Sequence, residues 1–162
     1  MTWIRGINHT FAVLAVLAPV AHVLELPNKL TLDAQLWLSV QQYLYRGWGP
    51  LLGGPTELGA LFTSLVLTYL RRQSGALLAA TVVANCGYAG MLAAFFFINQ
   101  PVSRAVASWT PTSLPPDWMV YRARWETGHA IAAVLAVVSL VALIRAYMGE
   151  KGCWKVPDVR GG

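Results

Sequence analysis

Charged side chains are scarce in this sequence, and their scarcity argues against a soluble fold. Asp, Glu, Lys and Arg make up 12% of the 162 residues, against roughly 25% in ordinary soluble domains. Hydrophobic residues make up 56%, and the mean hydropathy is +0.51. A soluble domain of this size would not cover its surface with so few charges. The composition therefore predicts an all-α domain in a lipid bilayer, with a soluble, very apolar helical bundle as the alternative.

Cysteines and concentrated basic patches are also missing. The two cysteines are Cys86, inside an apolar run, and Cys153, in the C-terminal tail, so we expect no disulfide between them. Their spacing does not match a zinc site. The net charge is +5, but the basic residues form no patch interleaved with aromatics. No nucleic-acid partner is therefore predicted.

Four apolar runs are present, and they predict an integral membrane four-helix bundle. They cover residues 11–26, 51 or 56 to 70, 76–98 and 130–145. Residues 31–46 are amphipathic and predict an additional interfacial helix between the first two spans. Three prolines predict a loop over residues 99–116. We expect one transmembrane domain over residues 1–148 and a polar tail over 149–162.

Two further features concern the first and last spans. The first run is short, and Ala18-Pro-Val-Ala21 behind it also fits a signal-peptide cleavage site. The apolar helical pattern continues past Ala21, which favours a retained helix.

In the last span, Gly128, Ala132 and Ala136 form a stripe of small residues that predicts close helix packing.

The distribution of charge predicts how the chain crosses the membrane. Four spans place both termini and the turn at residues 71–75 on one side. Basic residues exceed acidic ones on that side, whereas they are equal in number on the other. Basic loops stay in the cytoplasm, so we expect cytoplasmic termini in a bacterial inner membrane.

Antiparallel threading brings polar residues from all four spans to the outer side. His22 and Glu25 lie three residues apart at the end of the first span, as do Glu126 and His129 at the start of the last. Such pairs project from one helix face. Glu57 begins the second span. Ionisable groups beside spans are costly and tend to face a functional interior.

This set predicts a candidate metal site. Di-metal carboxylate bundles use Glu-x-x-His pairs on two helices and single glutamates on two others. The candidate ligands, for iron or copper, are His22, Glu25, Glu57, Glu126 and His129. The match is partial, because one pair is reversed and the third span offers Asn99 instead of a glutamate. The alternative is a network of interhelical hydrogen bonds and ion pairs with nearby arginines.

Tryptophans are concentrated near the same side. Trp109, Trp118 and Trp125 fit an aromatic belt at the membrane–water interface. They are also candidates for the wall of a pocket that binds an aromatic substrate.

Two stretches of the sequence combine polar, aromatic and proline residues in a distinctive pattern. The first stretch is Ala21-His-Val-Leu-Glu-Leu-Pro-Asn-Lys29 with Trp37 and Gln41-Gln-Tyr-Leu-Tyr45. The second is Asn99-Gln-Pro-Val-Ser103 with Trp109, Pro116-Asp-Trp118 and Arg122-Ala-Arg-Trp-Glu-Thr-Gly-His129. Together they resemble the anthrone oxygenase-like membrane proteins, a family with four predicted spans. The likeness extends over residues 6–145, and its most specific part is the second stretch.

The resemblance implies that Asn99, Trp125 and His129 are motif residues. It also implies oxidation of an anthrone-like ring carbon by dioxygen. The sequence departs from the family pattern at Ser103, often a second Asn, and at Ala132, often an Arg.

We therefore expect a membrane oxidoreductase that acts on a lipophilic aromatic or quinone-like substrate. A carboxylate (Glu57 or Glu126) or His129 is the candidate general base. Arg122 or Arg124 is the candidate to stabilise an enolate-like oxygen. Dioxygen alone, or dioxygen with a transition metal, is the expected cofactor. The alternatives are a non-enzymatic subunit or scaffold of a larger complex, and a small-molecule or metal-binding membrane protein. The expected partners are the lipid bilayer, a lipophilic small molecule, and other copies of the chain or a larger membrane complex.

Overall fold

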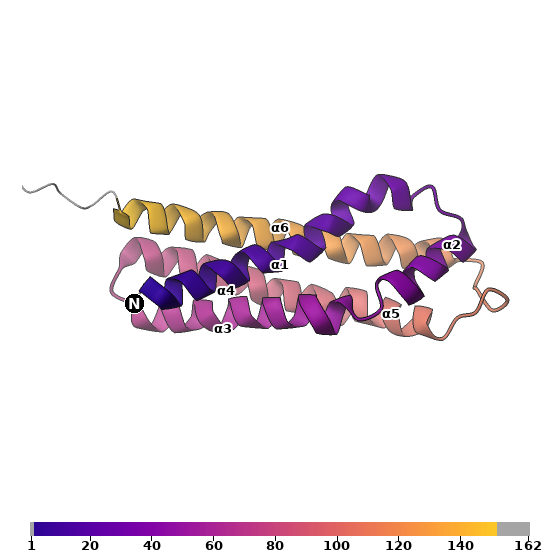
Figure 1. Cartoon of the computed structure of the whole chain (residues 1–162), viewed down its shortest axis with the longest axis horizontal. Coiled ribbons are helices and arrows are strands. Elements are labelled where there is room, and N and C mark those ends of the chain that lie inside the picture. Colours follow the sequence, from indigo (N-terminus) through magenta and orange to yellow (C-terminus); the bar gives the residue numbers. More distant parts are fainter. Residues whose placement is uncertain (1, 152–162) are drawn as a thin grey trace, which may run out of the picture.

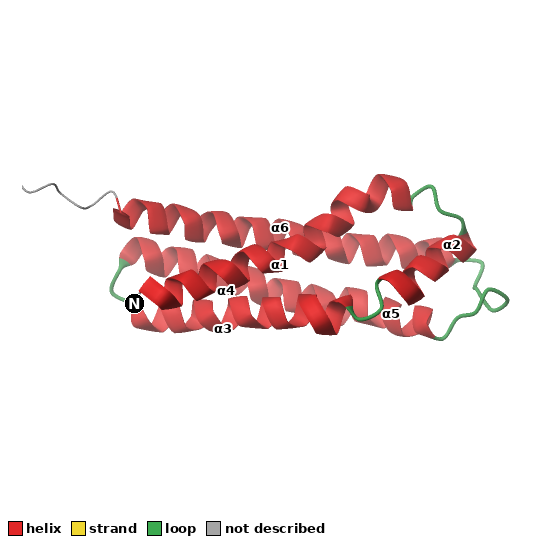
Figure 2. Ribbon diagram, in the orientation of Figure 1, coloured by secondary structure: helices red, strands yellow, loops and turns green. Residues whose placement is uncertain are grey.

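The computed structural model describes residues 2–151, and within them the chain is helical and contains no strands (Figure 2). The long helices are α1 (Thr2–Lys29), α3 (Gly54–Leu70), α4 (Gly75–Ala94) and α6 (Trp118–Lys151). The shorter segments are α2 (Ala34–Ser39), α5 (Gln100–Ala107) and the π-helical turns η1 (Val40–Leu44), η2 (Gly49–Gly53) and η3 (Phe95–Asn99). Cys153 and residues 152–162 of the predicted tail lie outside the described residues.

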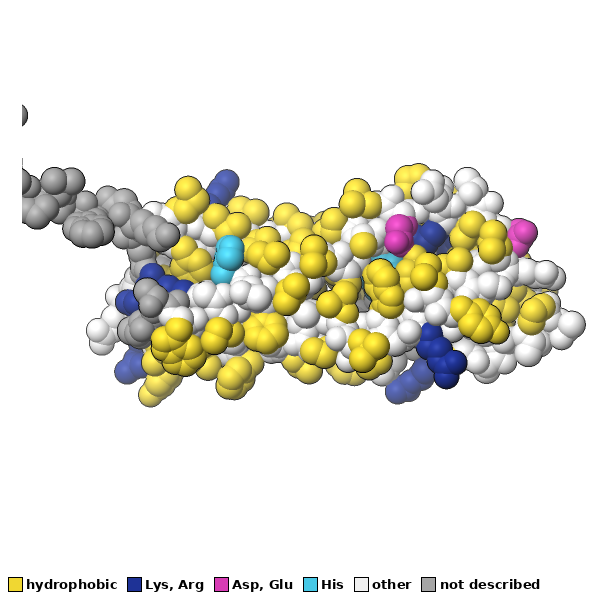
Figure 3. Space-filling view, viewed as in Figure 1, with side chains coloured by type: hydrophobic (Ala, Val, Ile, Leu, Met, Phe, Trp, Pro, Cys, Tyr) yellow, Lys and Arg dark blue, Asp and Glu magenta, His cyan; other side chains and the backbone are white. Residues whose placement is uncertain are grey.

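Within the described residues, four helical runs are long and apolar enough to cross a bilayer. They are Trp3–Lys29, Ala34–Leu70, Gly75–Ala107 and Trp118–Met148. In Figure 3 hydrophobic side chains cover the middle of the visible face, and Lys and Arg lie toward the two ends. This arrangement confirms the predicted all-α transmembrane bundle.

The four runs lie side by side along the long axis (Figure 1). α1 starts and α6 finishes at the end marked N in Figure 1. We call the opposite end, where α1 ends, α4 continues into α5 and α6 begins, the distal end. It carries the polar residues that the sequence predicts to converge.

The first helix is longer than the apolar run at residues 11–26. It starts before that run and passes through Pro19 and Pro27. Near its start, Asn8 is fully buried and donates to Thr63 Oγ1 over 3.0 Å, while Tyr147 donates to Asn8 Oδ1 over 2.8 Å. These bonds tie the beginning of α1 to α3 and α6.

Small residues allow the helices to pack closely in the middle of the bundle. Ala132 and Ala136 of α6 belong to a core cluster with Ala84 of α4, as the small-residue stripe predicts. Gly87 of α4 faces Ser139 of α6, and a Cβ atom on Gly87 would overlap the Ser139 hydroxyl. A larger residue at Gly87 would therefore push α4 and α6 apart.

The predicted loop over residues 99–116 is wrong in its first half. The third run continues through η3 into α5, so the non-helical segment begins only after Ala107. Pro101 lies in the first turn of α5, where a missing N–H breaks no intrahelical bond. The three later prolines, which motivated the prediction, do lie in the connection before α6.

The amphipathic segment between the first two spans is helical, as predicted. α2 is capped by Asp33, whose side chain accepts from the Leu36 N–H over 2.8 Å. Its apolar face buries Trp37 and Leu38 in a cluster with Val102 of α5. This packing holds α2 and η1 over the distal end of the bundle.

Candidate functional site

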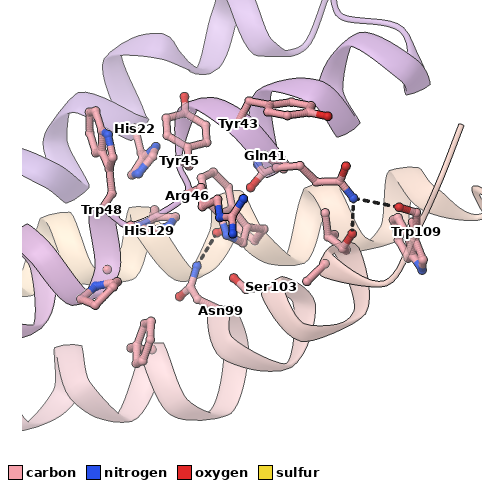
Figure 4. Close-up of a pocket in the computed structure, with 18 residues that line it drawn as sticks. His22, Gln41, Tyr43, Tyr45, Arg46, Trp48, Asn99, Ser103, Trp109 and His129 are labelled. Carbon is pink, nitrogen blue, oxygen red and sulfur yellow. Dashed lines mark hydrogen bonds between the residues drawn. The ribbon is translucent and has the colours of Figure 1, made fainter.

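A cavity of about 630 Å³ opens at the distal end of the bundle (Figure 4). This volume lies within the range of roughly 300–1,000 Å³ that is typical of small-molecule sites. Its wall is formed by His22, Gln41, Gln42, Tyr43, Tyr45, Arg46, Gly47, Trp48, Gly49, Pro50, Phe95, Asn99, Ser103, Val106, Ala107, Trp109, Trp125 and His129. The wall combines aromatic rings with a few polar groups, and residues from all four helical runs contribute to it.

The π-helical turns all border this cavity. Gln41 comes from η1, Pro50 from η2 and Asn99 from η3. A π-helical turn inserts an extra residue into a helix and commonly occurs at functional sites. Here the turns redirect side chains that an uninterrupted α-helix would aim elsewhere.

A single glycine allows the chain to turn between η1 and η2. Gly47 has φ 93, in the left-handed region, and lies between η1 and η2. The turn places the rings of Tyr45 and Trp48 against His22, with centroid separations of 4.6 and 5.7 Å. A side chain at position 47 would strain the turn that closes this side of the cavity.

Two histidines from the first and last helices meet in the cavity wall. The rings of His22 and His129 lie 4.1 Å apart at an angle of 37°. Trp125 packs edge-on against both, at 4.7 Å from His22 and 4.3 Å from His129. His22 is 3% exposed. His129 makes no hydrogen bond or ion pair to another described residue, so its imidazole remains available to a ligand.

An ammonium group occupies the centre of the predicted metal-ligand set. Lys29 Nζ lies 2.9 Å from Glu126 Oε2, 3.5 Å from His22 Nδ1 and 3.8 Å from Glu25 Oε2. Lys29 and Glu126 are both buried. The convergence of these side chains is therefore as expected, but the cation they surround belongs to the protein.

This arrangement does not fit a bound metal ion. A divalent cation placed among these groups would meet the positive charge of Lys29 at close range. Glu25 also accepts a hydrogen bond from the Tyr45 hydroxyl. Among the described side chains, His, Cys, Asp and Glu residues form no group of three or more able to hold a metal. The predicted five-residue ligand set is replaced by an ion-pair network.

Glu57 is separate from this network. It lies in the first turn of α3 and is half-buried. It has no hydrogen-bond or ion-pair partner among the described residues and does not line the cavity. The sequence places it correctly at the distal end but not within the site.

The two arginines predicted to face the substrate have structural partners instead. Arg122 donates to the carbonyls of Lys29 and Leu32, each over 3.3 Å, at the end of α1. Arg124 donates to the Phe97 carbonyl over 2.9 Å, within η3. Neither lines the cavity. Both satisfy carbonyls where helical bonding is interrupted.

Of the three tryptophans predicted to wall a substrate pocket, two line the cavity and one does not. Trp125 and Trp109 line the cavity, as the substrate-pocket prediction expects. Trp118 does not line it, and its ring packs 5.6 Å from Trp37 with Arg122 stacked over it at 4.7 Å. Trp118 therefore supports the wall from behind.

Asn99 is held in a fixed orientation at the edge of the cavity. It is 3% exposed and donates to the Trp125 carbonyl over 2.8 Å. Its carboxamide lies directly against Gly128, where a Cβ atom would overlap it. Gly128 thus allows η3 to approach α6 closely.

Replacing Gly128 by alanine is therefore expected to lower the free energy of unfolding by about 1–3 kcal/mol, because the buried Asn99 amide must move. Gly6→Ala in α1 is the matched control, since nothing lies within 4 Å of its Cβ position. That change should leave stability unchanged or raise it by up to about 1 kcal/mol. Unfolding by denaturing detergent in mixed micelles measures both. Equal stability of the two variants would contradict the close approach.

Four polar residues of the wall were not predicted from the sequence as site residues. Gln41, Gln42, Arg46 and Ser103 line the cavity, but the pattern assigned 31–46 to an interfacial helix and Ser103 to a loop. Arg46 immediately precedes a Gly/Pro-rich break over residues 47–55, which is the available signal that the chain turns at this point.

Comparisons of the chain with protein-family models, curated proteins and solved structures find no match.

Proposed function

We propose that the chain is a membrane-embedded oxygenase-like oxidoreductase that acts on a lipophilic aromatic or quinone-like substrate in the distal cavity. The observation that carries the proposal is the pair of adjacent imidazoles, His22 and His129, in the wall of a cavity of about 630 Å³ that is also lined by Trp109 and Trp125. The family resemblance supplies the reaction class. A lipophilic substrate reaches such a site from the surrounding bilayer.

The reaction needs a base, an electron-rich carbon and dioxygen. In an anthrone-like substrate, loss of a proton from the ring methylene gives a delocalised carbanion. Addition of dioxygen to this carbon gives a ring-bound peroxide anion, which takes back the proton to form a hydroperoxide. Loss of water then leaves a carbonyl group. One dioxygen is consumed and one water released for each methylene oxidised to a carbonyl.

His129 is the proposed base. It lines the cavity, whereas His22 is engaged by Lys29, which donates to its Nδ1. Glu126 is paired with Lys29 and does not line the cavity, so we assign it the role of holding Lys29 in place. We assign His22 the role of positioning the His129 imidazole, because the two rings pack together.

We further propose that the chain lies in a bacterial inner membrane with cytoplasmic termini. The excess of basic residues near the termini and at the turn at residues 71–75 supports this orientation. The proposed catalytic cavity then opens near the non-cytoplasmic surface of this inner membrane.

Turnover of anthrone by the purified protein in lipid nanodiscs tests the function. We expect oxygen uptake and anthraquinone formation in equal amounts, above the rate in protein-free nanodiscs. Ser103→Trp should lower the rate by about tenfold or more, because Ser103 is exposed at the cavity wall and an indole there narrows the space for the substrate.

Ser108→Trp is the matched control. Ser108 lies at the end of the same helix, is exposed and does not line the cavity. It should retain the wild-type rate. If saturable binding of anthrone occurs with no oxygen uptake above background, the protein is a binding protein and the oxidoreductase proposal is rejected.

A further inference from the structure

The wall of the cavity carries a positive charge and no negative one. Arg46 lines it, whereas none of the lining residues is Asp or Glu. Arg46 makes no hydrogen bond or ion pair to any residue in the described part of the chain. Figure 4 shows its guanidinium directed toward the space between Gln41 and Asn99. An arginine directed into a cavity without a carboxylate partner is suited to bind an anion.

A second donor lies beside it. Gln41 lines the cavity, and its Nε2 is buried without an acceptor among residues 2–151. Its neighbour Gln42 differs, because its Nε2 donates to the Val106 and Trp109 carbonyls over 2.9 Å each. Buried donors are normally satisfied. The unused amide of Gln41 therefore indicates an acceptor that a ligand supplies.

The remaining charged groups near the cavity are already compensated. Lys29 pairs with Glu126 and lies close to Glu25. Arg122 and Arg124 donate to backbone carbonyls. Arg46 is thus the cation that a ligand in the cavity meets without displacing an existing bond.

We propose that the cavity binds its aromatic ligand through an anionic oxygen, a carboxylate or ionised phenol, held by Arg46 and Gln41. This inference rests on the proposed function in that the same cavity is the substrate site. The anionic group lies between Arg46 and Gln41, and the rings of Trp109 and Trp125 contact the aromatic body. His129 then faces the ring system, where the proposed proton transfer occurs.

Binding of a matched pair of probes tests the inference without requiring turnover. The probes are 9-anthracenecarboxylate and the neutral 9-anthracenecarboxamide, titrated into the full chain in phosphatidylcholine nanodiscs. Saturable energy transfer from tryptophan to anthracene gives each Kd, corrected with empty nanodiscs. We expect the carboxylate to bind about 10- to 100-fold more tightly than the amide, as for hydrogen bonds to charged groups.

Substitutions then assign the preference to Arg46. Arg46→Ala should weaken carboxylate binding to the level of the amide and leave amide binding unchanged. Arg46→Lys should keep part of the preference, because the charge remains and the planar fork is lost. Arg104→Ala is the control: Arg104 is an exposed arginine at the same end and does not line the cavity. It should retain the full preference.

Three outcomes overturn the inference in distinguishable ways. Equal affinities of the two probes for the wild type reject the anion subsite and leave the cavity as a candidate substrate site. Absence of saturable binding of either probe rejects the proposed function together with it. Displacement of the carboxylate by phosphatidylglycerol in the wild type but not in Arg46→Ala assigns Arg46 to a lipid phosphate instead.

Discussion

Replacing His129 by alanine is expected to lower the rate of anthrone oxidation by roughly 10²- to 10⁴-fold, the usual contribution of a general base. The imidazole of His129 lines the cavity and has no competing hydrogen bond or ion pair within the described residues. Its loss leaves the cavity without an unpaired base, because Lys29 contacts both of the other candidates, His22 and Glu126. Steady-state oxygen uptake in nanodiscs measures the effect.

The other two histidines provide the comparison. His9 lies on α1 near Tyr147, at the opposite end of the bundle, and His9→Ala should retain the wild-type rate. His22→Ala should show a smaller loss than His129→Ala, because His22 positions the second ring. A rate for His129→Ala equal to that of His9→Ala would reject the assignment, provided that probe binding shows an intact cavity.

Replacing Lys29 by methionine is expected to lower the free energy of unfolding by about 3–5 kcal/mol, as when one partner of a buried ion pair is removed. Lys29 is 4% exposed and Glu126 is 8% exposed. Without Lys29 the Glu126 carboxylate stays buried, and its Oε1 already lacks a hydrogen-bond partner among the described residues. Unfolding in mixed micelles measures the loss.

A double substitution separates the ion pair from simple loss of packing. Lys29→Met with Glu126→Met removes both charges and should recover most of the lost stability, since paired buried charges contribute little over apolar residues of similar size. Arg104→Met is the control for removing a cation at the same end and should change stability by less than about 0.5 kcal/mol. Equal destabilisation of the single and double variants would contradict the pairing.

The architecture was predictable because it depends on long apolar runs. Helices of this length and composition must satisfy their backbone bonds internally in lipid, which leaves a helical bundle as the solution. Their alternating direction also brings His129 against His22, and brings His22 and Glu126 to a shared neighbour, Lys29. Patterns that extend over whole spans survive local irregularities.

The sequence left the centre of the site open, because spacing cannot distinguish a ligand set from a ring of ion-pair partners. His22 and Glu25 at three-residue spacing fit either role. Lys29 lies one further turn along the same face, and its ammonium takes the position that a metal would need. The sequence predicts arginines as the alternative partners of these carboxylates, whereas in the structure the partner is Lys29.

Local irregularities explain the remaining differences. An α-helical period places Asn99 and Ser103 beyond the third span, but η3 and α5 carry them into the cavity wall. π-Helical turns carry no sequence signal in a single chain, since they depend on packing between helices. The role of Arg46 in the cavity wall could not be predicted either, because η1 and the turn at Gly47 determine the direction of its side chain.

The contact between Lys29 and Glu126 has a consequence for biogenesis. The two residues are 97 positions apart in the chain, so ribosomes that add about 5–20 residues per second separate their synthesis by roughly 5–20 s. During that interval Glu25, one turn earlier on the same helix, is the acid within reach of the nascent lysine. Insertion of the final helix then transfers the lysine to its permanent partner, and the cavity is completed as the last step of assembly.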